Sequence, residues 1–214
     1  MPDVPVTDPA DHRGARFWNR FADRYAARPI KDTAAYEALL ADVAGRLRPT
    51  DHVLEIGCGT GGTAIALAPR VATFIATDFS AEMVRIANAK PAPDNLAFDV
   101  ATAQTALDGG PFDAICAFNV LHLVEDLPGL LRDIHRTLHP GGLLISKTWC
   151  FADLGRRPRL LFAVLKTVGL FPPATSLTEV QLRQMLQDAD FVIVDHRVFG
   201  TRPQNPTIIA RKPA

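Results

Sequence analysis

The sequence has few cysteines, no excess of charge of either sign and no long apolar run. Cys58, Cys116 and Cys150 stand far apart among 214 residues, and no Cys-x-x-Cys or Cys/His cluster occurs. This argues against a disulfide framework and a zinc site, and we expect no metal. Lys+Arg and Asp+Glu both number 23, so nothing attracts phosphate backbones in bulk and no nucleic-acid partner is expected.

The apolar segments are too short for membrane insertion. The longest, residues 160–171, is interrupted by Lys166, and the first 14 residues are polar and proline-broken rather than a signal-peptide core. We therefore expect a cytoplasmic protein without stable membrane insertion. A composition of 48% hydrophobic and 21% charged residues is ordinary for a globular protein, and the length suits one domain.

From residue 51 onward, apolar strands alternate with amphipathic helices. Before them, residues 16–25 and 34–47 have a helical pattern, and Pro49 is expected to end the second helix. The predicted strands are 52–56, 73–77, 96–100, 113–118 and 142–148, with helices at 61–68, 80–90, 126–138 and 178–188. Two closing apolar runs, 191–199 and 206–211, predict a hairpin.

This alternation predicts an α/β fold, a Rossmann-like, doubly wound sheet of seven strands with helices on both faces. The sheet is expected to be mostly parallel, with an antiparallel hairpin at its C-terminal end. Ligands of such sheets bind beyond the carboxyl ends of the strands.

A glycine-rich turn follows the first strand in the stretch VLEIGCGTGG, residues 53–62. Without Cβ atoms, Gly57, Gly59 and Gly61 let the chain turn tightly and let a ligand approach the backbone. Asp78 ends the second strand, where a carboxylate can accept both hydroxyls of a ribose. The spacing also satisfies G-x-G-x-x-G, so a nicotinamide dinucleotide, or a turn with no ligand, remains an alternative at this point.

Glu55 favours a different nucleoside. A dinucleotide places a pyrophosphate on this loop, and a nearby carboxylate opposes that charge. A ligand with an ammonium and a sulfonium group is favoured instead, which describes S-adenosylmethionine.

Four segments, taken in order, resemble the motifs of class I S-adenosylmethionine-dependent methyltransferases, and the resemblance covers nearly the whole chain. They are VLEIGCGTGG, TDFSAEM (residues 77–83), FDAICAFNVLHLVED (112–126) and LLRDIHRTLHPGGLLIS (130–146). The likeness is to the small-molecule enzymes of the ubiquinone-biosynthesis-like, type 11 group. It implies methyl transfer from S-adenosylmethionine to O, N or C of a small, largely apolar acceptor.

The resemblance also implies which residues bind the cofactor. Asp78 lies on the ribose, Phe79 and Met83 near the adenine, and Phe118 and Asn119 near the methionine and sulfonium. Many relatives carry a Gly-Asp-Ala after the third strand, whereas this chain has Thr102 in that register. We expect backbone groups of Ala101 and Thr102 to hold the adenine instead. The implied set is Tyr25, Glu55, Gly57, Cys58, Gly59, Gly61, Asp78, Phe79, Met83, Ala101, Thr102, Phe118 and Asn119.

Methyl transfer needs alignment and exclusion of water, and a base only if the acceptor keeps its proton. His122, in the turn 120–123, is the candidate catalytic base because a histidine titrates near neutrality. The alternative for His122 is a polar residue at the edge of the core, and for Phe118 it is core packing. An Asn/Asp-Pro-Pro-aromatic motif, typical of enzymes acting on DNA bases, is absent at residues 118–121.

Similar enzymes cover the cofactor with an N-terminal segment that contains a tyrosine. We therefore divide the chain into an N-terminal helical lid, 1–48, and a cofactor-binding domain, 49–214. Tyr25 could contact the sulfonium, since aromatic faces attract cations, or its helix could simply pack on the sheet. Within the domain, 148–177 is an insertion on the acceptor side. Its basic and apolar residues, 156–171, suit an acceptor pocket, a membrane-surface helix or a plain cover helix.

Two rival functions remain from the residues alone. One is an NAD-dependent oxidoreductase of the Rossmann type, which Glu55 and the closing hairpin disfavour. The other is a non-catalytic module that binds S-adenosylmethionine, although its loop shows no loss of Gly57, Gly59, Gly61 or Asp78. Association into a homodimer stays open.

Overall fold

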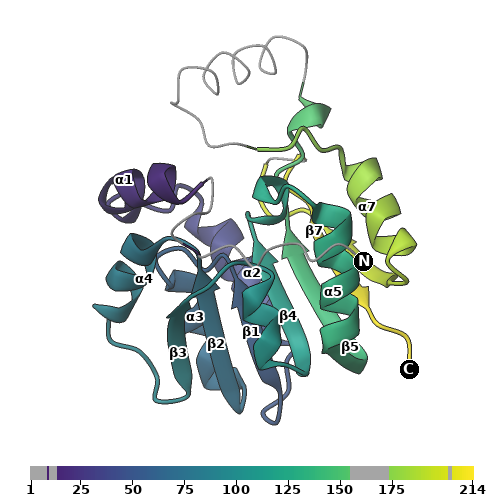
Figure 1. The fold of residues 1–214 in the computed structure, drawn as a ribbon, viewed down its shortest axis with the longest axis horizontal. Coiled ribbons are helices and arrows are strands. Elements are labelled where there is room, and N and C mark those ends of the chain that lie inside the picture. The colour runs from purple at the N-terminus through teal and green to yellow at the C-terminus, as the bar shows by residue number, and fades with distance from the viewer. Residues whose placement is uncertain (1–8, 10–13, 155–173, 202–203) are drawn as a thin grey trace.

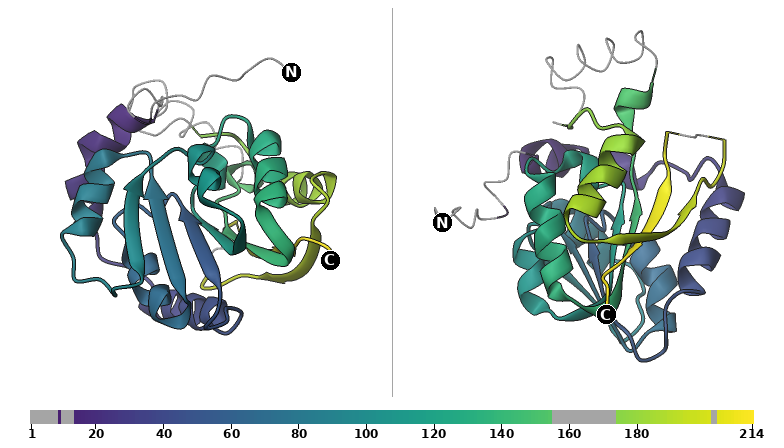
Figure 2. Two further views of the ribbon diagram at one scale, coloured as in Figure 1. Left: turned by 60° about the horizontal axis from the view of Figure 1, so that its bottom comes forward. Right: turned by 90° about the vertical axis from the view of Figure 1, so that its right-hand side faces the viewer.

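The computed structural model describes residues 9, 14–154, 174–201 and 204–214, and in them seven strands form one sheet with helices on both faces (Figure 1, Figure 2). The strand order is β3-β2-β1-β4-β5-β7-β6. The bounds are β1 His52–Ile56, β2 Thr73–Asp78, β3 Leu96–Val100, β4 Phe112–Phe118, β5 Leu138–Lys147, β6 Val192–Arg197 and β7 Thr207–Arg211. The predicted fold class is confirmed.

The first five strands are parallel neighbours, and β7 then runs antiparallel between β5 and β6. The chain order reverses between β1 and β4, so the loops after these two strands lie at the switch point of the sheet. In doubly wound sheets this is where ligands bind.

Two layers of helices cover the two faces of the sheet (Figure 2). The helices α2 (Thr33–Ala44), α3 (Gly62–Leu67) and α4 (Ala81–Asn88) cover one face, and α1 (Ala15–Ala26) lies beside α4 (Figure 1). The other face carries α5 (Leu127–Thr137) and α7 (Glu179–Asp188). Single turns of 3-10 helix occur at Ala68–Arg70, Thr105–Gly109, Leu121–Leu123 and Phe151–Asp153.

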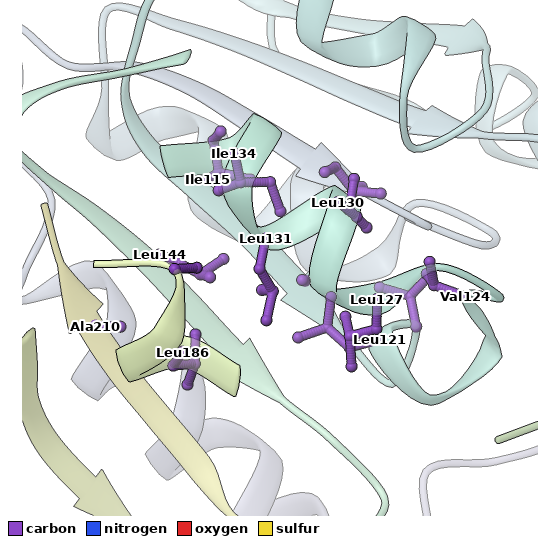
Figure 3. Close-up of a cluster of buried hydrophobic side chains, with 14 of the residues drawn as sticks. Ile115, Leu121, Val124, Leu127, Leu130, Leu131, Ile134, Leu144, Leu186 and Ala210 are labelled. Carbon is purple, nitrogen blue, oxygen red and sulfur yellow. The ribbon is translucent and has the colours of Figure 1, made fainter. Parts of the chain in front are cut away.

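The core under α5 shows how the sequence pattern becomes packing. Asp126 caps the helix by accepting a 2.9 Å hydrogen bond from the Gly129 N–H, and a proline occupies the first turn. The apolar stripe then faces the sheet, with Leu131 and Ile134 fully buried against Leu144 and other core residues (Figure 3). Burial of each such side chain stabilises the fold by about 1.5–3 kcal/mol.

Two boundaries differ from the prediction by three residues or more. Helix α2 ends at Ala44, because the Gly45 N–H closes the last turn on the Ala41 carbonyl oxygen, so Pro49 lies beyond the helix end. Strand β5 begins at Leu138 rather than at residue 142, since Leu138 pairs with Phe112 and a register shift follows in the ladder. The predicted alternation of strands and helices is otherwise confirmed.

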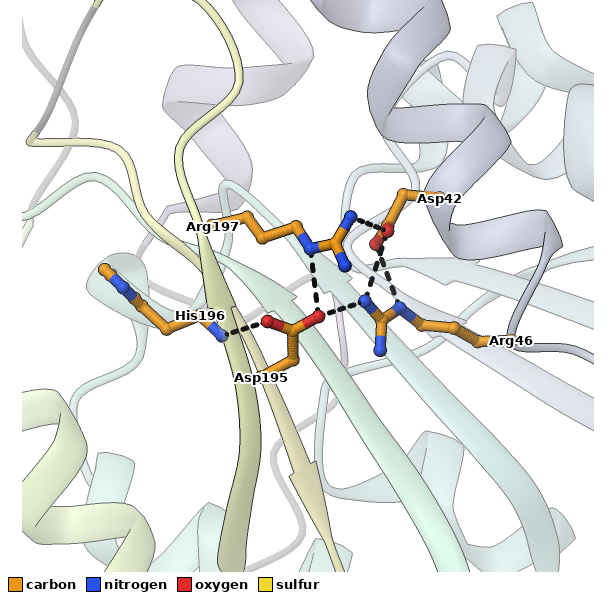
Figure 4. A network of polar contacts seen from close by, with 5 residues as sticks. All are labelled: Asp42, Arg46, Asp195, His196 and Arg197. Carbon is orange, nitrogen blue, oxygen red and sulfur yellow. Dashed lines mark hydrogen bonds and ion pairs between the residues drawn. The ribbon is translucent and has the colours of Figure 1, made fainter.

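An ion-pair network joins α2 to β6 (Figure 4). Arg46 binds Asp42 at 2.9 Å and also pairs with Asp195, while Arg197 binds Asp42 at 2.7 Å and Asp195 at 2.9 Å. Each carboxylate therefore bridges two guanidinium groups. The network fastens the N-terminal part of the chain to the far edge strand of the sheet.

Over the described residues, no helix combines the length and apolarity that crossing a membrane requires.

Candidate cofactor site

The glycine turn after β1 depends on glycine at specific positions. Gly57, Gly59 and Gly61 have φ of +70°, +55° and +78°, a region that side chains rarely tolerate. A Cβ on Gly57 would lie 2.5 Å from a methyl carbon of Val120, and one on Gly61 would lie 2.6 Å from the Phe98 ring. At Gly59 the nearest atom, on Tyr25, is 3.8 Å away. The middle of the turn is therefore the part with room for a ligand.

Asp78 organises this turn from the end of β2. Its Oδ2 accepts a 2.9 Å hydrogen bond from the Gly59 N–H, and its Oδ1 accepts one of 2.8 Å from the Ser80 N–H. The residue is 9% exposed. Burial raises the pKa of the carboxyl, whereas the two backbone bonds lower it. Each oxygen keeps a lone pair, so the carboxylate can also accept the two hydroxyls of a ribose.

Glu55 is buried beneath the turn, where it pairs in the sheet with Ala76 on one side and Cys116 on the other. Its Oε2 atom has no hydrogen-bond partner among the described residues. Burial, and then the charge of Asp78, raises its pKa to about 8. A buried carboxyl beside a second acid is a site that favours an incoming cation.

Cys58 lies within the same turn and holds it to β2. Its N–H donates a 2.9 Å hydrogen bond to the Thr77 carbonyl oxygen, and its side chain is buried. Burial and the nearby Glu55 raise the pKa of its thiol well above the usual value, so the thiol stays neutral. The residue is structural within the turn rather than a nucleophile.

Helix α1 is held against this edge of the sheet by a residue that the sequence pattern did not single out. Asn19 Oδ1 accepts a 2.7 Å hydrogen bond from the Ser80 hydroxyl and a 3.4 Å bond from the Glu82 N–H. Ser80 in turn caps α4 by accepting from the Met83 N–H at 3.2 Å. Nothing in the pattern of α1 marks Asn19, because its partners come from a segment more than 60 residues away.

Tyr25 lies at the end of α1, over the glycine turn. Its ring meets that of Trp18 edge to face, with centroids 5.9 Å apart, and 45% of the residue is exposed. Desolvation of the phenol, followed by the charge of Asp78, raises its pKa. The structure thus brings the predicted residues Tyr25, Glu55 and Asp78 together around Gly59.

The predicted adenine-side residues line the neighbouring ends of β2 and β3. Phe79 is half-buried and Met83 is buried. The Ala101 N–H donates a 3.1 Å hydrogen bond to the Asp78 carbonyl oxygen, and the Thr102 hydroxyl bonds the Thr105 hydroxyl at 3.0 Å. The buried Thr102 side chain is therefore engaged within its own loop. Val100, at the end of β3, leaves 44% of its surface exposed beside these residues.

At the end of β4, the half-buried Phe118 is followed by Asn119, which is exposed and has a φ of +56°. The Asn119 N–H donates a 2.6 Å hydrogen bond to the Lys147 carbonyl oxygen of β5. Asparagine is among the few side chains that occupy this backbone region readily. The turn directs Val120 under Gly57 and leaves the Asn119 side chain at the switch point.

His122 is buried, not placed at an open surface. Its ring lies edge-on to Phe151 at 5.2 Å, and its Nδ1 has no hydrogen-bond partner in the described part of the chain. Burial lowers its pKa to about 4, so the expectation that it titrates near neutrality is wrong. The imidazole is neutral at pH 7 and is a weak base.

The insertion predicted at 148–177 is described only at its two ends. Residues 155–173, which include all of the basic and apolar stretch 156–171, lie outside the described residues. At the ends, the Thr175 N–H bonds the His122 carbonyl oxygen at 2.8 Å, and the Ala152 N–H bonds that of Leu177 at 3.0 Å. The first bond anchors the C-terminal end beside the turn after β4, and the second ties the two ends to each other.

Comparison with known proteins decides the family. Residues 19–196 match the model of a family described as a methyltransferase domain. The chain belongs to this methyltransferase domain family. The match includes the glycine turn, Asp78 and the turn after β4, so the described site lies within the matched residues.

Relatives and solved structures agree with this family. The trans-aconitate 2-methyltransferase of Deinococcus radiodurans is 34% identical over 129 residues, 59% of this chain and 45% of that protein. Equisetin synthetase of Fusarium heterosporum is 31% identical over 118 residues, 50% of this chain but 3% of that protein. The chain thus spans well under two thirds of the length of these relatives.

Among solved structures, the magnesium protoporphyrin IX methyltransferase of Synechocystis PCC 6803, with bound S-adenosylhomocysteine, has a TM-score of 0.70. It is 22% identical, and the alignment covers 96% of this chain and 100% of that one. The likeness shows a shared fold. Family and fold together make the chain an S-adenosylmethionine-dependent methyltransferase domain, and the prediction of its cofactor is confirmed.

Proposed function

We propose that the chain transfers the methyl group of S-adenosylmethionine to O, N or C of a small, largely apolar acceptor. The observation that carries the proposal is the buried Glu55 beneath the glycine turn, with one oxygen unpartnered and Asp78 nearby. A cationic nucleoside can draw this carboxyl into its ionised form and pair with it, whereas a pyrophosphate gains no partner there. The rival oxidoreductase function needs the opposite charge at this place.

The predicted residues have distinct roles in holding the cofactor. Glu55 faces the methionine end, Asp78 accepts the ribose hydroxyls, and Asn119 lies at the sulfonium side. Phe79, Met83, Ala101 and Thr102 hold the adenine, and Gly57, Cys58, Gly59, Gly61 and Phe118 shape the turn and its floor. Tyr25 covers the turn from α1, as part of a lid that we assign to residues 1–48. Because the N–H groups of Ala101 and Thr102 already donate to Asp78 and Thr105, their part in holding the adenine is to shape its place rather than to donate to it.

When bound, S-adenosylmethionine supplies a methyl group on a positively charged sulfur. This chain contributes alignment through Asp78 and Asn119, and exclusion of water through α1 and Tyr25. For an acceptor that keeps its proton, we assign His122 a hydrogen-bonding role rather than that of the base, because burial lowers its pKa to about 4.

We assign the acceptor to the edge formed by the ends of β4 and β5, where the insertion 148–177 begins. We further propose a cytoplasmic location, supported by three free, buried cysteines, and a small-molecule partner rather than nucleic acid. Light scattering of the purified chain tests whether it forms a homodimer.

Calorimetric titration with S-adenosylhomocysteine and with NAD tests the cofactor site. We expect saturable binding of the first and none of the second, and tight binding of NAD alone would contradict the proposal. Incubation with S-adenosylmethionine and small-molecule extracts, followed by an untargeted mass search for products heavier by one methylene, tests the transfer. The failure of every extract to yield such a product, despite cofactor binding, would favour the non-catalytic module.

A further inference from the structure

A half-buried lysine stands at the acceptor edge without an ion pair. Lys147 ends β5, next to Phe118 of β4 and opposite Thr207 of β7. Burial lowers the pKa of its ammonium, and the charge of Asp32 raises it. No carboxylate in the described part of the chain forms an ion pair with it.

Arg197 makes the contrast clear. It belongs to the same row of cross-strand neighbours, because it pairs with Thr207 from β6. Arg197 is bound by Asp42 and by Asp195, at 2.7 and 2.9 Å. Arg197 therefore has two carboxylate partners, whereas Lys147 forms no ion pair with a described residue.

Thr207 supplies the second observation. It is 1% exposed, and its Oγ1 has no hydrogen-bond partner among the described residues. Directly paired residues project from the same face of a sheet. The Thr148 N–H bonds the Pro206 carbonyl oxygen at 3.1 Å, so the next pair, Lys147 with Thr207, is a non-hydrogen-bonded one. The Cβ atoms of such pairs lie roughly 4.5–5.5 Å apart, which lets both polar groups meet one ligand.

We propose that Lys147 and Thr207 form a binding site for a carboxylate carried by the methyl acceptor. An ammonium and a hydroxyl donor match the two oxygens of one carboxylate. A phosphate dianion fits less well, because Asp32 lies close and no second unpaired cation accompanies Lys147 in this row. The substrate class that follows is a small acid with an apolar body.

The position of the site indicates that the bound carboxylate belongs to the acceptor rather than to the cofactor. Phe118 lies between Lys147 and the strand that leads to Gly57, so Lys147 is two strands away from the glycine turn (Figure 1). Two strand spacings amount to about 9.5 Å. The Lys147 carbonyl oxygen also fixes Asn119, at 2.6 Å, so the site adjoins the predicted sulfonium side. This assignment rests on the proposed methyl transfer.

Binding of trans-cinnamate and of its neutral amide, cinnamamide, to the chain saturated with S-adenosylhomocysteine tests the site. We expect the acid to bind at least tenfold more tightly than the amide. Lys147→Met should remove that preference and leave the affinity for S-adenosylhomocysteine within twofold. The matched control Lys31→Met removes an exposed lysine and should preserve the preference.

Thr207→Val provides a second, isosteric variant. Removal of a buried hydroxyl without a partner should leave thermal stability unchanged or raised. Even so, trans-cinnamate should bind to this variant about tenfold more weakly than to the wild-type chain. Equal affinities of acid and amide in the wild-type chain, or a preference that survives Lys147→Met, would overturn the proposal. A tenfold loss of S-adenosylhomocysteine affinity in Lys147→Met would assign the carboxylate to the cofactor and overturn it as well. Because the readout is binding, failure of methyl transfer alone leaves this test intact.

Discussion

The backbone N–H of Gly59 donates a 2.9 Å hydrogen bond to the Oδ2 atom of Asp78. The residue that is predicted to hold the ribose therefore also holds the glycine turn in its left-handed conformation. Shape and recognition at this site depend on the same carboxylate, so a change at Asp78 affects both.

Asp78→Ala should weaken binding of S-adenosylhomocysteine by about 1.5–3 kcal/mol, the usual scale for hydrogen bonds to a charged group. Calorimetry measures the loss directly. Asp94→Ala is the matched control, because Asp94 is an exposed carboxylate that precedes β3, at the opposite end of that strand from the site, and should leave the affinity unchanged. An unaltered affinity in a folded Asp78→Ala chain would refute the ribose role.

Glu55 predicts a pH dependence of cofactor binding. In the unliganded chain its carboxyl holds a proton below pH 8, and a bound cation favours the ionised form. Affinity for the ammonium-bearing S-adenosylhomocysteine should thus rise between pH 6 and 8, by at most about tenfold per pH unit, and level off above. Glu55→Gln should flatten this profile, and a variant that retained the slope would show that another group is responsible.

The same carboxyl should make the stability of the unliganded chain fall with rising pH, whereas cofactor affinity rises. Its folded pKa of about 8 lies above the unfolded value of about 4.3. The stabilisation that the protonated carboxyl gives the folded chain is therefore fully present below pH 4.3 and is lost as pH rises through 8. Relative to wild type, Glu55→Gln should gain stability between pH 5 and pH 9. Denaturant titrations of the unliganded chains at the two pH values measure the difference.

Gly61 and Gly62 are adjacent, but alanine should affect them differently. At Gly61 the φ of +78° and the 2.6 Å approach to Phe98 predict a loss of about 1–3 kcal/mol of stability. At Gly62, the first residue of α3, a Cβ lies 3.8 Å from the Tyr36 hydroxyl, and alanine should be neutral or stabilising by roughly 0.5–1 kcal/mol. Equal effects in thermal unfolding would contradict the described turn.

The network between α2 and β6 should be sensitive to acid and to salt. The hydrogen bond from Arg46 lowers the pKa of Asp195, so the contribution of this carboxylate is present above about pH 4 and is lost as pH falls through the folded pKa. Asp195→Asn should cost roughly 0.5–1 kcal/mol at pH 7, and less in 1 M salt. Asp94→Asn, at an exposed position, should cost nothing measurable under either condition.

The order and type of the elements followed from sequence periodicity, because strand and helix patterns both depend on local apolar spacing. The ends of the helices and strands were predicted less accurately. Helix α2 ends at Ala44 rather than at residue 47, and β5 starts at Leu138 because Phe112 is available to pair with it. Such ends depend on partners from distant strands, and no local window contains them.

The site residues also divide into those that local sequence could predict and those that depend on distant partners. The glycine turn, Glu55 and Asp78 could be predicted because they occupy fixed places around one strand–helix junction. The burial of His122 against Phe151 and the lack of an ion pair at Lys147 could not, since both depend on which strands become neighbours. Asn19 was missed because its partners, Ser80 and Glu82, lie at the start of α4, more than 60 residues away.

The placement of β7 between β5 and β6 has a consequence for synthesis. Strand β6 leaves the ribosome before β7, yet in the finished sheet it bonds only to β7. Until β7 emerges, β5 presents an open edge, and Arg46 has Asp42 but lacks its second carboxylate, Asp195, which lies 149 positions downstream. The sheet, the ion pairs between α2 and β6, and the Lys147 row are therefore completed together, when β7 pairs with β5 and β6.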